Sequence, residues 1–147
     1  MYKIRTEVEW DYAHRLIATD GEFYSKNHCG SNHGHRGKAV ITLCSIGVDK
    51  FGFVIDFGII RKIIKNWIDN NWDHSTLVNP KDYDLIEFLT NQGDRHFIMP
   101  DGYTTSAESM AKFLYLKIRE LIEFDHGASL KEVTVYETPT SSATYSE

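Results

Sequence analysis

The sequence YKIRTEVEWDY, residues 2–12, carries charged side chains at its odd positions and mostly apolar side chains at its even positions. Because successive side chains of a β-strand point to opposite faces, this alternation predicts a strand with one buried face. A second strand is predicted at residues 36–47, with a short continuation at residues 53–56 after a turn that contains glycine. Residues 18–34, between the two strands, are rich in Gly, Asn, Ser and His and are expected to form a long loop.

Two later segments repeat apolar residues at helical spacing. One covers residues 57–70, and the other begins near Thr105, where Thr105 and Glu108 have the spacing of a capping box. Four shorter elements are predicted from the same kinds of pattern: a helix at residues 83–90 and strands at residues 96–99, 130–138 and 143–146.

The long elements follow the order of two strands, two helices and two strands (ββααββ). This order predicts an α+β fold, in which a four-stranded antiparallel sheet carries its helices on one face. The 147 residues suffice for one domain with a core, and they contain no Pro- and Ser-rich linker, so we expect a single domain over residues 1–147. Such a sheet has open edge strands, which pairing with other subunits would protect.

Composition and charge exclude several classes of protein. The formal net charge of -5 argues against sequence-independent binding to nucleic acid, which needs an excess of Lys and Arg. No apolar run is long enough to span a bilayer, and residues 1–9 are too highly charged for a signal peptide. With Cys29 and Cys44 as its only cysteines, the chain is expected to keep reduced thiols in the cytoplasm.

Three histidines are candidate metal ligands. His33 and His35 flank Gly34 in a segment that is expected to be extended, so their side chains point to the same side, and His14 closes the first strand. Three imidazoles with one open position are typical of catalytic zinc sites. The alternative is that these are ordinary loop histidines, because short motifs often match by chance.

Cys29 and the pair Asp73-His74 are candidates for proton transfer. Cys29 lies four residues before His33, where a nearby cation would favour the thiolate and allow it to act as a general base. A carboxylate next to an imidazole, as in Asp73-His74, commonly orients that imidazole for proton transfer. The simpler alternatives are a loop cysteine without a role and a polar helix terminus.

Glu137 lies in the predicted strand at residues 130–138, on the same face as Val133 and Val135. An acid on an apolar face is expected to be paired or to bind a ligand. A carboxylate accepts two parallel hydrogen bonds, which matches the guanidine-like edge of a pterin or a guanine.

Six motifs of the chain occur in the order in which they are found in a known family: WDYAHRL at residues 10–16, Cys29 followed by His33-Gly34-His35, VIDF at residues 54–57, Asp73-His74 with Leu77 and Asn79, SAE at residues 106–108, and Glu137-Thr138. Together they resemble the 6-pyruvoyl-tetrahydropterin synthase family, and most closely its 6-carboxy-5,6,7,8-tetrahydropterin synthase branch. The resemblance covers essentially the whole chain.

The resemblance implies the T-fold, in which subunits join their sheets into a barrel and two trimers form a homohexamer. It also implies the site residues: Zn²⁺ bound by His14, His33 and His35, proton transfer by Cys29, Asp73 and His74, and pterin binding by Glu137, Ser106 and Glu108.

The substrate that the resemblance implies is 7,8-dihydroneopterin triphosphate. The products would be triphosphate, acetaldehyde and 6-carboxy-tetrahydropterin, a precursor of queuosine and other 7-deazaguanines. Three residues separate Cys29 from His33, as in the carboxy-forming enzymes, whereas the pyruvoyl-forming enzymes have a longer gap. The alternatives are a 6-pyruvoyl-tetrahydropterin synthase and a pterin-binding T-fold protein without catalysis.

The chain departs from the family pattern in two places. Arg36-Gly37-Lys38 follows His35, and its two cations either help to bind the triphosphate or face solvent. Residues 88–103 form a longer segment than in compact members and are expected to be a surface elaboration.

Overall fold

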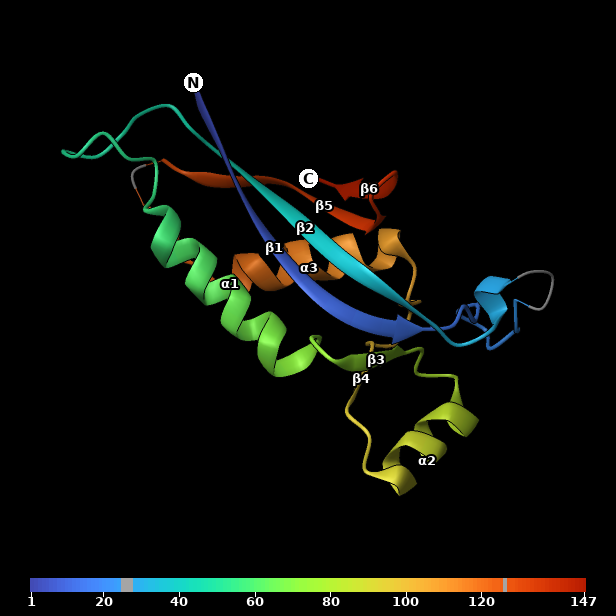
Figure 1. Ribbon diagram of the computed structural model, residues 1–147. Coiled ribbons are helices and arrows are strands. Elements are labelled where there is room, and N and C mark those ends of the chain that lie inside the picture. Colours follow the sequence, from blue (N-terminus) through green and yellow to red (C-terminus); the bar gives the residue numbers. More distant parts are fainter. Residues whose placement is uncertain (25–27, 126) are drawn as a thin grey trace.

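The computed structural model describes residues 1–24, 28–125 and 127–147, and these residues form one six-stranded sheet with three α-helices (Figure 1). The strands are β1 (Tyr2–His14), β2 (His33–Ser45), β3 (Ser75–Val78), β4 (His96–Ile98), β5 (Ser129–Thr138) and β6 (Ser141–Tyr145). The helices are α1 (Phe57–Asn71), α2 (Tyr83–Gln92) and α3 (Ala107–Leu121), with a short 3₁₀ helix at His28–Gly30.

The sheet has the strand order β4-β3-β1-β2-β5-β6. β1 and β2 pair antiparallel over their full lengths, from Tyr2 opposite Ser45 to His14 opposite His33. β5 and β6 extend this antiparallel part, whereas β3 joins β1 in parallel and β4 joins β3 in parallel. The register places the last residue of β1 beside the first residue of β2.

Helices α1 and α3 cover one face of the sheet, with α1 packed along β1 and α3 along β5 and β6 (Figure 1). Each helix presents an apolar stripe at helical spacing to that face, and the buried members of the two stripes include Ile60, Ile64, Ile68, Met110, Leu114 and Ile118. On β1, alternate side chains from Val8 to His14 are buried against the helices. The core therefore continues along β1 up to His14.

The structure confirms the α+β class and the position of the two long helices, but the sheet differs from the predicted four antiparallel strands. β3 was not predicted, because its four residues are too few to show an alternating pattern. Its parallel pairing with β1 and β4 makes the sheet mixed. None of the helices in the described residues is long and apolar enough to cross a membrane.

Two local predictions were wrong. Residues 53–56 do not form a strand, because the Asp56 side chain accepts hydrogen bonds from the backbone N–H groups of Gly58 and Ile59 and caps α1. At α3 the capping residue is Ser106, which accepts from the N–H of Ser109. Thr105 is instead fully buried beside β1.

Residues 88–103 are not only a surface elaboration, as predicted, because they also contribute to the sheet and to the core. They contain the edge strand β4, and Met99 is buried in the core. Phe97 packs edge-on against Trp72, with ring centroids 6.2 Å apart, and against Phe113 at 5.7 Å. This segment therefore extends the core beyond α1.

Candidate metal centre and acid–base pair

Three histidines and one carboxylate converge on the helix-covered face of the sheet, where β1 ends. Ligand atoms of His14, His33, His35 and Glu137 all lie within 4.8 Å of one another. The three imidazole centroids form a nearly equilateral triangle with sides of 4.7, 4.9 and 5.1 Å. The strand register explains this, because His14 lies opposite His33 and His35 follows two residues later on the same face.

Backbone carbonyls orient two of these imidazoles. His14 Nδ1 lies 2.7 Å from the carbonyl oxygen of Thr105, and His33 Nδ1 lies 2.6 Å from that of Ser31. Because a carbonyl oxygen can only accept a hydrogen bond, Nδ1 carries the proton in each ring. Nε2 then keeps its lone pair, which is the tautomer that a metal-binding histidine needs.

The Nε2 atoms of His14 and His35 are buried and have no hydrogen-bond partner among the described residues. Glu137 Oε1 lies 3.2 Å from the first and 2.9 Å from the second, but these contacts lack the alignment of hydrogen bonds. Burial lowers the pKa of both histidines, although the Glu137 charge opposes this effect. Neutral imidazoles with unshared lone pairs and a neighbouring carboxylate suit a zinc ion, so these residues fit the metal that the sequence suggests.

Tyr12 lies next to this cluster, on the same face of β1. Its ring centroid is 5.2 Å from that of His14 and 5.6 Å from that of His35. Burial, and to a smaller extent the Glu137 charge, raises the pKa of Tyr12 far above its ordinary value. The phenol therefore stays protonated and can act as a hydrogen-bond donor.

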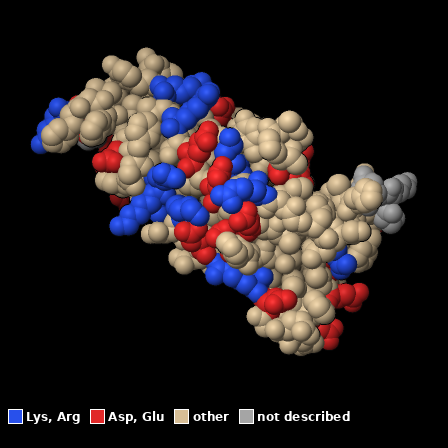
Figure 2. All heavy atoms as spheres, in the orientation of Figure 1, with Lys and Arg blue, Asp and Glu red and all other residues tan. Residues whose placement is uncertain are grey.

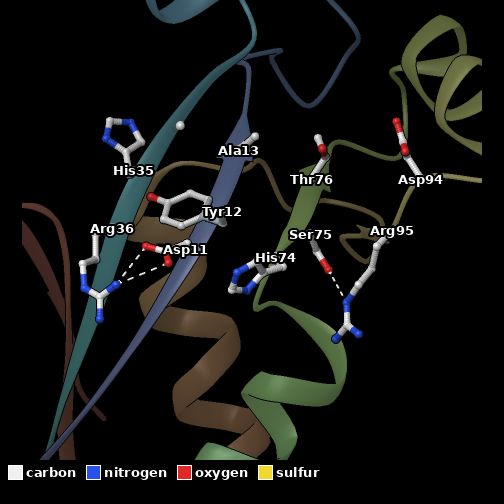
Figure 3. Close-up of a pocket in the computed structure, with 11 residues that line it drawn as sticks. Asp11, Tyr12, Ala13, His35, Arg36, His74, Ser75, Thr76, Asp94 and Arg95 are labelled. Carbon is white, nitrogen blue, oxygen red and sulfur yellow. Dashed lines mark hydrogen bonds and ion pairs between the residues drawn. The ribbon is translucent and has the colours of Figure 1, made fainter.

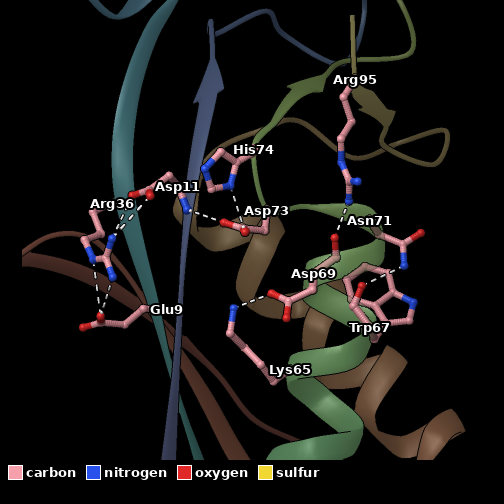
Figure 4. A network of polar contacts seen from close by, with 10 residues as sticks. All are labelled: Glu9, Asp11, Arg36, Lys65, Trp67, Asp69, Asn71, Asp73, His74 and Arg95. Atoms are coloured by element: carbon pink, nitrogen blue, oxygen red, sulfur yellow. Dashed lines mark hydrogen bonds and ion pairs between the residues drawn. The ribbon is translucent and has the colours of Figure 1, made fainter.

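Asp73 and His74 follow Trp72, the C-cap residue of α1, and both are hydrogen-bonded to the backbone of Asp11 in β1 (Figure 4). Asp73 accepts hydrogen bonds from the backbone N–H of Asp11 at 2.9 Å and from His74 Nδ1 at 2.8 Å. Burial alone would raise the pKa of Asp73, but these hydrogen bonds bring it below its ordinary value. An ionised Asp73 thus orients His74, whose side chain is 75% exposed.

This acid–base pair forms a group separate from the three histidines. Ligand atoms of Asp73 and His74 cluster with Asp11, not with the imidazoles of the first group. However, His35 and His74 both line a hollow of about 560 Å³ at the ends of β1, β2 and β3 (Figure 3). A second hollow of about 500 Å³ is lined by His35 and Glu137. His35 therefore borders both spaces.

The other predicted site residues lie outside both groups. The backbone carbonyl of Cys29 accepts a hydrogen bond from the N–H of Leu16 at 2.9 Å, so Cys29 is held close to the end of β1. No disulfide joins it to Cys44. Ser106 lines a hollow of about 380 Å³ together with Leu16, whereas Glu108 is exposed on the first turn of α3.

The sequence patterns did not predict the residues that hold the histidine cluster in place through hydrogen bonds. Thr105 orients His14 through its carbonyl, and its hydroxyl donates to the carbonyl of Arg15 at 3.1 Å. Arg15 in turn forms a bidentate ion pair with the buried Asp82, with N–O distances of 2.6 and 2.7 Å. Asp82 stands before a predicted helix and was identifiable as a cap, but no local pattern predicts its pairing with Arg15.

The cations that follow His35 are already engaged by acids of β1. Arg36 contacts Glu9 at 3.1 Å and Asp11 at 3.2 Å, and Lys38 lies 3.7 Å from Glu7. Figure 2 shows positive and negative side chains interleaved across the middle of this face. These pairs favour the solvent-facing interpretation of the two cations over triphosphate binding.

Solved structures share this fold over nearly the whole chain. An uncharacterized protein from Wolinella succinogenes superposes with a TM-score of 0.79 at 22% identity, covering 99% of this chain and 97% of the other. The 6-pyruvoyl tetrahydropterin synthase of Caenorhabditis elegans gives a TM-score of 0.72 at 21% identity, covering 99% and 95%. The molecule thus has the T-fold of the tetrahydropterin synthases.

Sequence comparison identifies the family. The 6-carboxy-5,6,7,8-tetrahydropterin synthase of Rickettsia felis is 32% identical over 140 residues, which cover 95% of this chain and 96% of the relative. The protein of the same name from Haemophilus influenzae is 29% identical and is covered completely. A family model described as 6-pyruvoyl tetrahydropterin synthase matches residues 3–147. The chain therefore belongs to the 6-pyruvoyl tetrahydropterin synthase family, as its motifs predicted.

Proposed function

We propose that the chain is a zinc-dependent 6-carboxy-5,6,7,8-tetrahydropterin synthase that converts 7,8-dihydroneopterin triphosphate to 6-carboxy-tetrahydropterin, acetaldehyde and triphosphate. The observation that carries this proposal is the convergence of His14, His33, His35 and Glu137 beside two hollows. The names of the full-length relatives support the choice of reaction. We further propose that the enzyme is a cytoplasmic homohexamer that serves queuosine and 7-deazaguanine biosynthesis.

The imidazoles of His14, His33 and His35 hold the zinc ion in this proposal. Zinc supplies a positive charge that polarises the hydroxyl groups of the substrate side chain and favours loss of a proton from the neighbouring carbon. The carbonyls of Thr105 and Ser31 keep two of the ligating rings in the required tautomer.

Cys29 and the pair Asp73-His74 move the protons. Cys29 acts in this proposal as the base that removes the proton from the substrate side chain. Asp73 holds His74 through its Nδ1, which leaves Nε2 to exchange a proton with the substrate. The exposure of His74 and its place in the hollow that it shares with His35 support this role.

Three further residues bind the pterin in this proposal. Glu137 accepts two hydrogen bonds from the N–H edge of the ring. The Ser106 hydroxyl already accepts from the N–H of Ser109, so it keeps its own proton to donate to a ligand in the hollow beside it. Glu108 contributes a negative charge at the start of α3.

A second candidate is 6-pyruvoyl-tetrahydropterin synthase activity. The description of the matching family model and the names of solved structures from Caenorhabditis elegans and Plasmodium vivax favour it. The three-residue gap between Cys29 and His33 favours the carboxy-forming reaction instead.

The test is to measure the zinc content of the purified protein and to incubate it with 7,8-dihydroneopterin triphosphate. Release of acetaldehyde with 6-carboxy-tetrahydropterin, identified by mass, supports the first proposal. Formation of 6-pyruvoyl-tetrahydropterin supports the second. Zinc-loaded protein that binds a pterin but converts nothing would refute both and leave a pterin-binding protein.

A further inference from the structure

Tyr12 is fitted tightly against the histidine cluster. Its side chain is 4% exposed, and it lies opposite His35 in the strand register. Space for its ring depends on Gly37, since a Cβ atom there would come within 2.9 Å of the Tyr12 ring and 2.8 Å of the Trp10 ring. The position of the phenol is therefore set by packing, and its hydroxyl cannot reach solvent by a simple rotation.

The hydroxyl of Tyr12 is buried and has no hydrogen-bond partner in the part of the chain that the structure describes. A buried hydroxyl without a partner destabilises a protein, and a phenylalanine would fill the same space without that cost. The buried Nε2 atoms of His14 and His35 also lack hydrogen-bond partners, and both lie next to Glu137. The Tyr12 hydroxyl thus lies beside the imidazole–carboxylate cluster without a hydrogen-bond partner of its own among the described residues, which points to a role when a ligand is bound.

Glu137 is the acceptor that best matches the Tyr12 donor. Its Oε1 atom lies against the two imidazole nitrogens, which leaves the lone pairs of Oε2 available. The Glu137 charge is close enough to act on the Tyr12 hydroxyl. A phenol that donates to a carboxylate restricts the orientation of that carboxylate, and a fixed orientation is required to receive two N–H groups of a pterin.

We propose that the Tyr12 hydroxyl donates a hydrogen bond to the Glu137 carboxylate in the ligand-bound site and positions that carboxylate for the pterin ring. This inference rests on the proposed function, because it assigns Glu137 to a pterin. Tyr12 is a positioning residue in this proposal, since it acts on the ligand through Glu137.

The first test is the variant Tyr12→Phe, which removes the hydroxyl and keeps the ring. We expect its affinity for neopterin, measured by fluorescence titration, to fall about 10- to 100-fold, as for loss of a hydrogen bond to a charged group. Its KM for the substrate should rise with little change in kcat. Its zinc affinity should be unchanged, and the metal-free variant should melt at the same temperature as the parent protein or higher.

Tyr115→Phe is the matched control. Tyr115 is also buried, but its hydroxyl donates to the carbonyl of Leu130 at 3.4 Å, near the start of β5, whereas Glu137 lies near the end of that strand. This variant should lose thermal stability and keep its affinity for neopterin. The two tyrosine variants are therefore expected to show opposite combinations of the two measurements.

The second test repeats Tyr12→Phe in the background of Glu137→Gln, with neopterin titrated to millimolar concentration. If Tyr12 acts through Glu137, loss of the hydroxyl changes the affinity by less than about 2-fold in that background. Unchanged affinity of the single variant, or an equal loss in both backgrounds, overturns the inference. A parent protein that binds no neopterin refutes the proposed function itself, so the two failures are distinguishable.

Discussion

The ion pair between Arg15 and Asp82 makes a quantitative prediction about stability. Asp82 has a side chain that is 2% exposed, and it accepts two hydrogen bonds from the guanidinium of Arg15. It also caps α2 by accepting from the N–H of Leu85. The variant Asp82→Ala removes both interactions at once and leaves the guanidinium without its counterion.

The structure sets the size of the expected loss. Removing one partner of a buried ion pair costs about 3–5 kcal/mol, and losing a helix cap costs about 1 kcal/mol. The Arg15 side chain is 23% exposed, so it regains part of its hydration when Asp82 is absent. We therefore expect Asp82→Ala to lower the free energy of unfolding by about 2–4 kcal/mol.

Urea unfolding followed by tryptophan fluorescence measures this loss. Asp82→Asn keeps an acceptor for the cap and should cost about 1–2 kcal/mol, because only the charge is removed. Lys65→Ala breaks the exposed pair with Asp69 one turn away on α1, and it should cost less than about 0.5 kcal/mol. If Asp82→Ala lowers the free energy of unfolding by no more than Lys65→Ala does, the Arg15–Asp82 ion pair does not stabilise the segment after β1.

Three further predictions concern the candidate site. His14→Ala should lower zinc affinity by at least about 100-fold, measured by competition with a chelator, because it removes a ligand that Thr105 holds in place; unchanged affinity would contradict the proposed ligand set. Cys29→Ala should bind zinc normally but turn over at least about 100-fold more slowly, and turnover at the parent rate would exclude the thiol as the base. Glu137→Ala should keep its zinc and lose neopterin binding, whereas loss of zinc would make Glu137 a metal ligand.

The pKa shifts of the buried histidines predict how the stability of the metal-free protein depends on pH. Burial lowers the pKa of His14 and His35, so the unfolded chain takes up protons at a higher pH than the folded protein does. The free energy of unfolding should therefore have its highest value above about pH 6.5 and should decrease as the pH falls below that value. Melting temperatures between pH 7.5 and 5.5 check this, and His14→Phe should show a shallower slope. A constant melting temperature over this range would contradict the reasoning.

The sequence by itself determined the elements that have a long local pattern. Alternation over residues 2–12 predicted β1, and apolar spacing predicted α1 to within a residue of its ends, because burial on one face imposes a period on the side chains. The same argument predicted that His33 and His35 point to one side. The ordered motifs predicted the family, which the comparisons confirm.

Only the tertiary structure decided how these elements meet. β3 has four residues, and its Ser75 pairs with Tyr12, 63 residues earlier, so no local pattern predicts this strand. His14 lies beside His33 because of the strand register, and Glu137 reaches His14 and His35 because β5 lies next to β2. The carbonyl of Thr105 and the unpartnered hydroxyl of Tyr12 have no signature in the residue pattern. Their roles depend on which groups surround them, and packing between segments far apart in the chain sets those surroundings.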